Sequence, residues 1–235
     1  MNYLWAAGTH QGRLRNNNED AYAPESSGRG PGPVTVMVAD GMGGHAGGEV
    51  ASRLAVDTAL IAEGPLAERI SKANRVVIDT ALREPQLAGM GTTLTMAELG
   101  PEGAVRLGHV GDSRAYLLHD DKLEMITADH TVVAEHVAAG RLSTQDALTH
   151  PQRSMLTRVL GLGHEVEVDE IDLQMHEGDR LLICSDGLTN MVPDARIAAI
   201  LGEASPEEAV WTLIEQANRA GGHDNITVAV VQVIP

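Results

Sequence analysis

Four aspartates stand at the ends of apolar, strand-like segments, each beside glycine or asparagine. Asp40 follows the apolar run VTVMVA, and five glycines occur in the eight positions after it. Asp112, Asp186 and Asp224 occur in a similar setting, within VGDS, CSDG and GHDN. Carboxylate oxygens without accompanying cysteine ligands favour hard divalent ions such as Mg²⁺ and Mn²⁺. The pattern therefore predicts that these aspartates share a metal centre.

An arginine could act together with the predicted metal centre. Arg15 lies in the polar segment RLRNNNED, which also contains Asn18, Glu19 and Asp20. Taken alone, this segment is typical of a solvated turn. Beside bound cations, however, the planar guanidinium of an arginine can hold two oxygens of a phosphate group. Carboxylates, cations and arginine together indicate phosphate-ester chemistry.

The glycine-rich segment VADGMGGHAGGE, residues 38–49, also permits other interpretations. Gly41, Gly43 and Ala46 fit a dinucleotide-binding fingerprint, but Asp40 would then place its negative charge against the pyrophosphate. A P-loop is excluded because neither Gly-Lys-Ser nor Gly-Lys-Thr occurs in the chain. A glycine-rich turn with a purely structural role remains an alternative, although it does not explain why Asp-Gly recurs elsewhere.

Composition narrows the class of protein. The 235 residues carry 33 acidic against 17 basic side chains, and a net charge of −16 disfavours nucleic acid and anionic membranes as partners. The single cysteine, Cys184, excludes a disulfide framework, and its apolar surroundings predict a buried, unreactive thiol. The sequence has no recognisable secretory leader or membrane-length apolar run, so we expect a cytoplasmic protein without a membrane anchor.

The periodicity of apolar residues predicts the elements that must position these side chains. Strands are expected near 3–9, 34–39, 92–98, 104–110, 114–119, 180–185 and 226–233, and the segment 25–33 is expected to be a loop. Helices are expected over 48–63 and 66–83, and a third begins with the capping box formed by Ser205 and Glu208. Short helices broken by Gly140 and Pro151 should lie outside the sheets, within 129–163. This order predicts a sheet-rich core flanked by helices.

Eight segments, in order along the chain, resemble the metal-dependent protein phosphatases of the PPM class, often called PP2C, in their compact bacterial form. They are RNNNED, VADGMGGHAGGE, GMGTTLT, HVGDSRAYLL, TADHT, THPQRSMLTRVLG, GDRLLICSDGLT and GGHDNITV. The resemblance implies an α+β fold, a four-layer α/β/β/α sandwich with two central, mostly antiparallel sheets flanked by helices. It also implies one catalytic domain over 1–235, with a small helical flap subdomain at about 129–163.

The resemblance implies specific metal ligands. Asp40 would bridge two ions, and the backbone carbonyl of Gly41 would join the first of them. Asp186 and Asp224 would bind the second ion. Asp112 is similar to the ligand of a third ion in bacterial members of the family, shared with Asp186.

The resemblance also implies roles around the ions. Glu19 and Asp20 would hold metal-bound waters, with Asn225 in a supporting position. Arg15 would bind the substrate phosphate, and His45 is similar to the residue proposed as the general acid for the leaving alkoxide.

Asp129 and His130 match an Asp-His pair of the family. We interpret them as a helix cap and an anchor for 129–163, a segment that would influence substrate choice.

The activity implied is hydrolysis of phosphoserine and phosphothreonine esters by direct attack of a metal-bridging water, with Mn²⁺ or Mg²⁺ as cofactors. Such an enzyme would act on phosphorylated proteins, as a monomer, and reverse bacterial serine/threonine kinase signalling. Two alternatives remain. One is a non-catalytic phosphoprotein-binding regulatory module on the same fold. The other is an acidic calcium-binding protein, which would lack any EF-hand loop and leave Arg15 and His45 unexplained.

Overall fold

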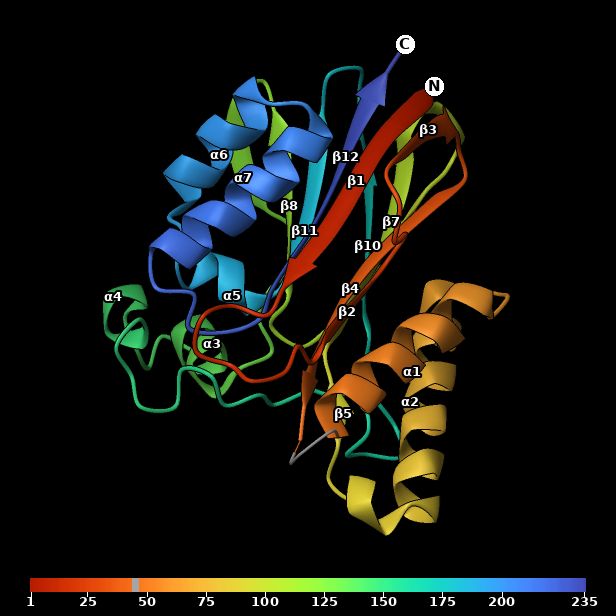
Figure 1. Cartoon of the computed structure of the whole chain (residues 1–235), viewed down its shortest axis with the longest axis vertical. Coiled ribbons are helices and arrows are strands. Elements are labelled where there is room, and N and C mark those ends of the chain that lie inside the picture. The colour runs from red at the N-terminus through yellow and green to blue at the C-terminus, as the bar shows by residue number, and fades with distance from the viewer. Residues whose placement is uncertain (44–46) are drawn as a thin grey trace.

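The computed structural model describes residues 1–43 and 47–235 and contains two antiparallel sheets packed face to face (Figure 1). In spatial order the first sheet comprises β3 (Gly28–Pro31), β1 (Asn2–His10), β12 (Ile226–Ile234), β11 (Arg180–Cys184), β8 (Arg114–His119) and β9 (Lys122–Met125). The second comprises β10 (Asp169–Gln174), β7 (Ala104–Val110), β6 (Leu94–Leu99), β4 (Val34–Met42) and β2 (Asp20–Ala23), with the short β5 (Gly91–Thr92) paired to β4.

Helices cover the outer face of each sheet, as Figure 1 shows. The first sheet is covered by α5 (Asp186–Thr189), α6 (Asp194–Glu203) and α7 (Pro206–Arg219), and the second by α1 (Gly47–Ile61) and α2 (Leu66–Arg83). Short 3₁₀ helices occupy Pro85–Leu87 and Pro101–Gly103. The predicted four-layer α/β/β/α sandwich is therefore confirmed. Within the described ranges, no helix has the length and apolar character needed to cross a membrane.

Three apolar clusters hold the four layers together, one at each boundary between layers. In β4, Val36 and Val38 face the other sheet, whereas Met37 and Ala39 face the helices. Because successive side chains of a strand point to opposite faces, a strand covered on both sides reads as a continuous apolar run. This explains why VTVMVA is so uniformly apolar. Cys184 is likewise fully buried, and burial raises the pKa of its thiol to about 12.

Most predicted elements are present near their expected bounds. The helix predicted over 66–83 is α2 (Leu66–Arg83), and α7 begins with the predicted capping box, in which Ser205 and Glu208 bond each other's backbone N–H. The prediction that 25–33 is only a loop is wrong, because β3 lies within it and pairs with β1. A strand of sequence GRGP has no apolar alternation to reveal it, since it is held at a sheet edge by backbone hydrogen bonds.

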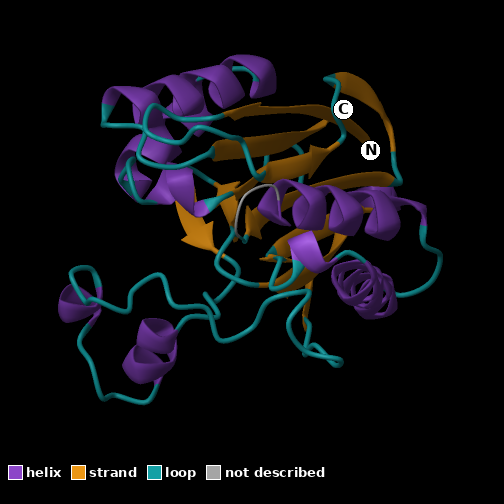
Figure 2. Cartoon of the chain, turned by 60° about the horizontal axis from the view of Figure 1, so that its bottom comes forward, coloured by secondary structure: helices purple, strands orange, loops and turns teal. Residues whose placement is uncertain are grey.

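The segment 129–163 leaves the sheets and contains only two short helices, α3 (Val132–Ala138) and α4 (Thr144–Ala147). Figure 2 shows both helices standing apart from the layered body of the molecule. Isolated bridges between Thr131 and Leu156 and between Thr92 and Leu160 tie the segment to itself and to the second sheet. Thr131, rather than Asp129, caps α3 by accepting a hydrogen bond from the backbone N–H of Ala134.

Candidate active site

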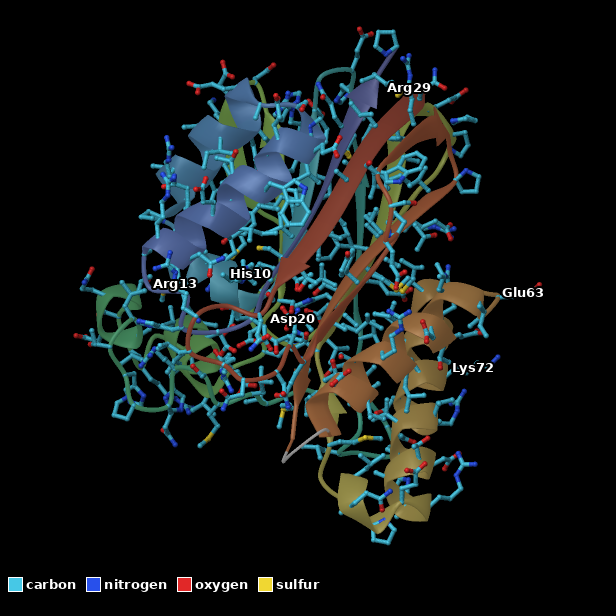
Figure 3. The ribbon with its side chains drawn as sticks, viewed as in Figure 1. His10, Arg13, Asp20, Arg29, Glu63 and Lys72 are labelled. Atoms are coloured by element: carbon cyan, nitrogen blue, oxygen red, sulfur yellow. The ribbon has the colours of Figure 1, made fainter. Side chains whose placement is uncertain are left out.

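Strand register directs several polar side chains into the space between the sheets at one end of the molecule. Val36, Val38 and Asp40 are alternate residues of β4 and so share one face of the strand, which points the Asp40 side chain toward the other sheet. Thr227 likewise shares a face of β12 with Ala229 and Val231, which also face that space. Figure 3 labels Asp20 at this end, on the same side as His10 and Arg13.

Asp20 and Asp40 are direct partners across the antiparallel pair β2–β4. Two carboxylates placed opposite each other repel. Burial first, and then the four surrounding aspartates, raise the pKa of Asp40 well above its ordinary value. Burial is also the main cause that raises the pKa of Asp20 to about 7, followed by hydroxyl hydrogen bonds that lower it and nearby carboxylates that raise it. The structure thus gathers negative charge where water is excluded.

Three further predicted ligands belong to this acidic cluster. Asp112 lies in the turn between β7 and β8, where burial and then the carboxylate of Asp186 raise its pKa to about 7. Asp186 is the first residue of α5, and burial and then Asp224 raise its pKa to about 6. Asp224 itself immediately precedes Asn225 and the start of β12. The structure therefore brings together the four aspartates that the sequence singled out.

The carboxylates of this cluster fit divalent cations. Oδ1 of Asp20 and Oδ1 of Asp186 are both buried without a hydrogen-bond partner among the described residues. An unpartnered buried carboxylate oxygen is costly unless a cation or a water satisfies it. An all-oxygen donor set of this kind suits Mg²⁺ or Mn²⁺.

Arg15 reaches the cluster from the loop that follows β1. Its Nη2 donates a hydrogen bond of 2.6 Å to Oδ2 of Asp224, and the side chains of the two residues are 51% and 34% exposed. This hydrogen bond is the largest cause of the raised pKa of Arg15. The guanidinium is thus held at the solvent-facing edge of the acidic cluster. A phosphate approaching from solvent would meet it first.

Asn225 fixes the loop that carries Arg15. Its Nδ2 donates to the carbonyl oxygens of Gln11 and Asn17, both at 2.8 Å, and its Oδ1 accepts from the backbone N–H of Glu19 at 2.8 Å. Both N–H groups and the carbonyl oxygen of the side-chain amide are therefore bonded to backbone. Its part in the site is to position the Arg15 loop, a role the sequence did not reveal.

Glycines allow the segments of the site to approach closely. A Cβ on Gly41 would collide with the carbonyl oxygens of Gly48 and Glu19, and a Cβ on Gly187 would collide with that of Asn225. The glycines that follow Asp40 and Asp186 therefore allow two backbone segments to come into close contact. β4 extends beyond the strand predicted over 34–39, because it continues past Asp40 to Met42 by pairing with β5.

Hydroxyl groups that the sequence reading missed surround Asp20. Ser185 Oγ and Thr227 Oγ1 donate to Asp20 Oδ2 at 2.8 and 2.6 Å. Because the only hydroxyl hydrogen of Thr227 is engaged there, Thr9 Oγ1 donates to Thr227 Oγ1 at 2.7 Å. Asn18 Nδ2 in turn donates to Thr9 Oγ1 at 2.9 Å. This chain of donors fixes the orientation of Asp20. In the sequence, Ser185 and Thr227 are marked only by their proximity to Asp186 and Asp224.

The Asp-His pair anchors the turn that carries Asp112. His130 Nδ1 accepts a hydrogen bond from the backbone N–H of Gly111 at 3.1 Å, so its Nε2 carries the proton and donates to Asp169 Oδ2 at 3.1 Å. Asp129 forms a bidentate pair with Arg114 at 2.8 and 2.7 Å. The anchoring role predicted for the pair is therefore confirmed, whereas the helix-capping role belongs to Thr131.

Two predicted site residues remain to be placed. Glu19 lies beside the cluster, where burial raises the pKa of its side chain against the lowering influence of Arg15. His45 lies outside the described residues, as do its neighbours Gly44 and Ala46.

The chain is similar in sequence and in structure to known phosphatases. The family model described as protein phosphatase 2C matches residues 7–218. Serine/threonine phosphatase stp of Listeria innocua is 41% identical over 239 residues, which cover 95% of this chain and 93% of the relative. The crystal structure of the Mycobacterium tuberculosis serine/threonine phosphatase PstP/Ppp superposes with a TM-score of 0.91 at 38% identity, covering 100% of both chains.

A second solved structure includes bound metal. The catalytic domain of the serine/threonine protein phosphatase PstP, in complex with two manganese ions, superposes with a TM-score of 0.88 at 37% identity and full coverage of both chains. The matched family segment spans the strands and loops that carry Arg15, Asp40, Asp112 and Asp186. The chain therefore belongs to the protein phosphatase 2C family.

Proposed function

We propose that this chain is a Mn²⁺-dependent phosphatase that hydrolyses phosphoserine and phosphothreonine esters of proteins. The observation that carries the proposal is the buried cluster of aspartates with two unpartnered carboxylate oxygens, bordered by Arg15. The relatives support it, because they are named serine/threonine phosphatases and one solved structure contains two manganese ions.

We assign Asp40, the carbonyl of Gly41, Asp186 and Asp224 to two divalent ions. Asp112, together with Asp186, would hold a third. Bound cations of this kind supply Lewis-acid activation of a water nucleophile and neutralise charge on the phosphoryl group. Mg²⁺ would serve as well as Mn²⁺, because the donor set is carboxylate and carbonyl oxygen.

The chain's own groups bind and orient the substrate. The Arg15 guanidinium, held at the edge of the acidic cluster, has the planar fork needed to donate hydrogen bonds to two phosphoryl oxygens. Asp20, fixed by Ser185 and Thr227, keeps Oδ1 free to accept a hydrogen bond from water. His45 is assigned from the sequence as the proton donor to the leaving serine or threonine oxygen.

The segment 129–163 would form a flap that influences substrate choice. Its support is its position outside the sheets and its attachment through His130 to Gly111, in the turn beside Asp112. The whole chain would then act as one catalytic domain on phosphorylated proteins.

A phosphate-release assay separates this function from the alternatives. Inorganic phosphate released from a phosphothreonine peptide is measured with Mn²⁺, Mg²⁺, Ca²⁺ or EDTA. We expect release with Mn²⁺ and Mg²⁺ and none with EDTA. Calorimetry run in parallel with Mn²⁺ identifies a binding module, because tight peptide binding without phosphate release would overturn the enzymatic function. Dependence on Ca²⁺ alone would indicate the calcium-binding alternative.

A further inference from the structure

A second group of metal-ligating side chains lies at the far end of the first sheet. His119 is the last residue of β8, and Asp179 immediately precedes β11 in the turn that also carries His176. The ligand atoms of these three residues all lie within 4.8 Å of one another. None of the three takes part in the acidic cluster described above.

A buried carboxylate lies at the base of this group. The Asp179 side chain is 5% exposed, whereas those of His119 and His176 are 49% and 64% exposed. Asp179 Oδ1 accepts from His119 Nδ1 at 2.7 Å, and Oδ2 accepts from the backbone N–H of His176 at 2.8 Å. A carboxylate has about four lone-pair sites, so each oxygen keeps one for a further partner.

The hydrogen bond to Asp179 places His119 as a ligand. His119 Nδ1 and Asp179 Oδ1 share one proton, and a divalent cation bound by both residues would take the place of that proton. Metal-binding histidines commonly donate their other ring N–H to a carboxylate. His119 Nε2 lies 3.5 Å from Asp120 Oδ2, so Asp120 is placed to orient the ring through Nε2–H when Nδ1 binds metal.

His176 completes the group, and its ring forms no hydrogen bond with the residues that the structure describes. Its Nδ1 lies 3.6 Å from Asp179 Oδ2, beyond hydrogen-bond distance. Its ring centroid lies 5.6 Å from that of His119, and the rings are tilted by 47°. Donor atoms of a tetrahedral Zn²⁺ site stand about 3.4 Å apart, as metal–ligand distances of about 2.0–2.1 Å require. Small rotations of the two exposed rings would bring the donors to this spacing.

We propose that His119, His176 and Asp179 form a transition-metal site, separate from the acidic cluster, that takes Zn²⁺ or a similar divalent ion. Two imidazoles and one carboxylate are the donor set preferred by such ions, whereas Mg²⁺ prefers oxygen alone. Bound metal would join the end of β8 to the turn before β11 and stabilise this edge of the fold.

The strand register separates the two sites. Arg180 of β11 pairs with Leu118 of β8, whereas Cys184 pairs with Arg114, at the end where Asp186 follows. Five residues of strand span about 15 Å, so the histidine group and the acidic cluster lie at opposite ends of β11. Figure 1 shows both chain termini at the end of the sheet away from α5. The histidine group belongs to that end, because Asp179 O accepts from Val233 N.

Calorimetric titration with Zn²⁺ at pH 8 tests the proposal. The background is the Asp40→Asn/Asp224→Asn variant, in which the acidic cluster is weakened as a competing site. We expect one equivalent of Zn²⁺ to bind, and His176→Ala or His119→Ala in the same background to weaken this binding at least tenfold. His164→Ala removes an exposed histidine elsewhere and should leave the isotherm unchanged.

Imidazole ¹H–¹⁵N spectra locate the ion in wild-type protein held in excess Mg²⁺. Zn²⁺ should shift the ring nitrogens of His119 and His176 together, and His176→Ala should abolish the shift of His119 while leaving phosphate release in Mg²⁺ unchanged. Equal Zn²⁺ affinity in His176→Ala and in its parent, or shifts confined to other histidines, would overturn the proposal.

Discussion

Arg15 and Asp224 are joined by a 2.6 Å hydrogen bond between a guanidinium Nη2 and a carboxylate Oδ2. The other oxygen of Asp224, Oδ1, accepts from the backbone N–H of Asn225. A cation bound by Asp224 would share Oδ2 with the arginine and weaken that pair. Metal binding would therefore release Arg15 toward an incoming phosphate, which links cation binding to substrate binding through one carboxylate.

Replacement of this arginine should impair substrate binding more than metal binding. Arg15→Lys keeps the charge but loses the bidentate fork. We expect kcat/KM for a phosphothreonine peptide to fall about 10²-fold, mainly through a higher KM. Mn²⁺ affinity, measured by calorimetry, should change by about fivefold or less, which corresponds to the ~1 kcal/mol of one hydrogen bond. Arg13→Lys, an exposed neighbour in the same loop, serves as the control, and an equal loss in that variant would contradict the role of Arg15.

Asp40→Asn should separate activity from stability. Loss of the charge at the centre of the cluster should lower Mn²⁺-dependent turnover of p-nitrophenyl phosphate by about 10³-fold or more. The same change removes repulsion from four neighbouring aspartates, so the metal-free variant should be more stable than wild type. We expect a gain of about 1–2 kcal/mol in the free energy of unfolding at pH 8, measured by urea denaturation in EDTA.

Near-normal turnover in this variant would show that Asp40 does not bind the catalytic ions. A loss of both turnover and stability would point instead to misfolding, which circular dichroism would reveal.

The sequence predicted the architecture well wherever side-chain periodicity specifies an element. The interior strands β4, β11 and β12 are buried on both faces and read as apolar runs, and α7 is marked by its capping box. The four strands at the sheet edges, β2, β3, β9 and β10, were not predicted, because each is paired on one side only and backbone pairing does much to hold it.

In the site, the sequence predicted the aspartates but not most of the groups that hold them in place. Aspartates were found because an acidic residue beside glycine at the end of an apolar run is unusual and recurs in the chain. Thr227 and Ser185 were missed as supports of Asp20, and Asn225 was predicted in a supporting position without its contacts to the Arg15 loop. Their contacts join residues about 165 to 208 positions apart, as in Ser185–Asp20 and Asn225–Asn17, and hydroxyl or amide groups carry no local pattern that reveals such partners.

Metal-free protein should become less stable as pH rises toward neutrality, because several buried aspartates have raised pKa values. The folded-state pKa values of Asp20 and Asp112 are raised to about 7, and that of Asp186 to about 6. The folded state therefore binds more protons than the unfolded chain between the ordinary aspartate pKa of about 3.9 and about 7. These three carboxyl groups therefore lower stability as pH rises through this window.

Urea denaturation in EDTA at pH 6, 7 and 8 measures this trend, and we expect the lowest stability at pH 8. His109, whose pKa burial lowers to about 4, acts in the opposite direction below about pH 6.5, so the comparison is restricted to the upper range. Saturating Mn²⁺ should abolish the decline and release protons at pH 6.5, detectable with a pH indicator. A stability in EDTA that rises from pH 6 to 8 would contradict the raised pKa values.

Thr227→Val tests whether the donors to Asp20 support the cations. Valine keeps the shape of threonine, but Asp20 Oδ2 loses its 2.6 Å hydrogen bond and keeps only that from Ser185. Asp20 is then less firmly oriented, so we expect Mn²⁺ affinity and kcat/KM to fall about tenfold, in the range typical when a supporting partner of a metal site is removed.

Thr9→Val is the matched comparison, because Thr9 donates to Thr227 and lies one hydrogen bond farther from Asp20. Its effect on Mn²⁺ affinity should be smaller than that of Thr227→Val, while both variants keep the unfolding midpoint of wild type within a few degrees, as expected for about 1 kcal/mol. Equal losses in the two variants would indicate a general loosening of β1 and β12 rather than a specific effect on Asp20. A normal Mn²⁺ affinity in Thr227→Val would show that Ser185 alone is sufficient to orient the carboxylate.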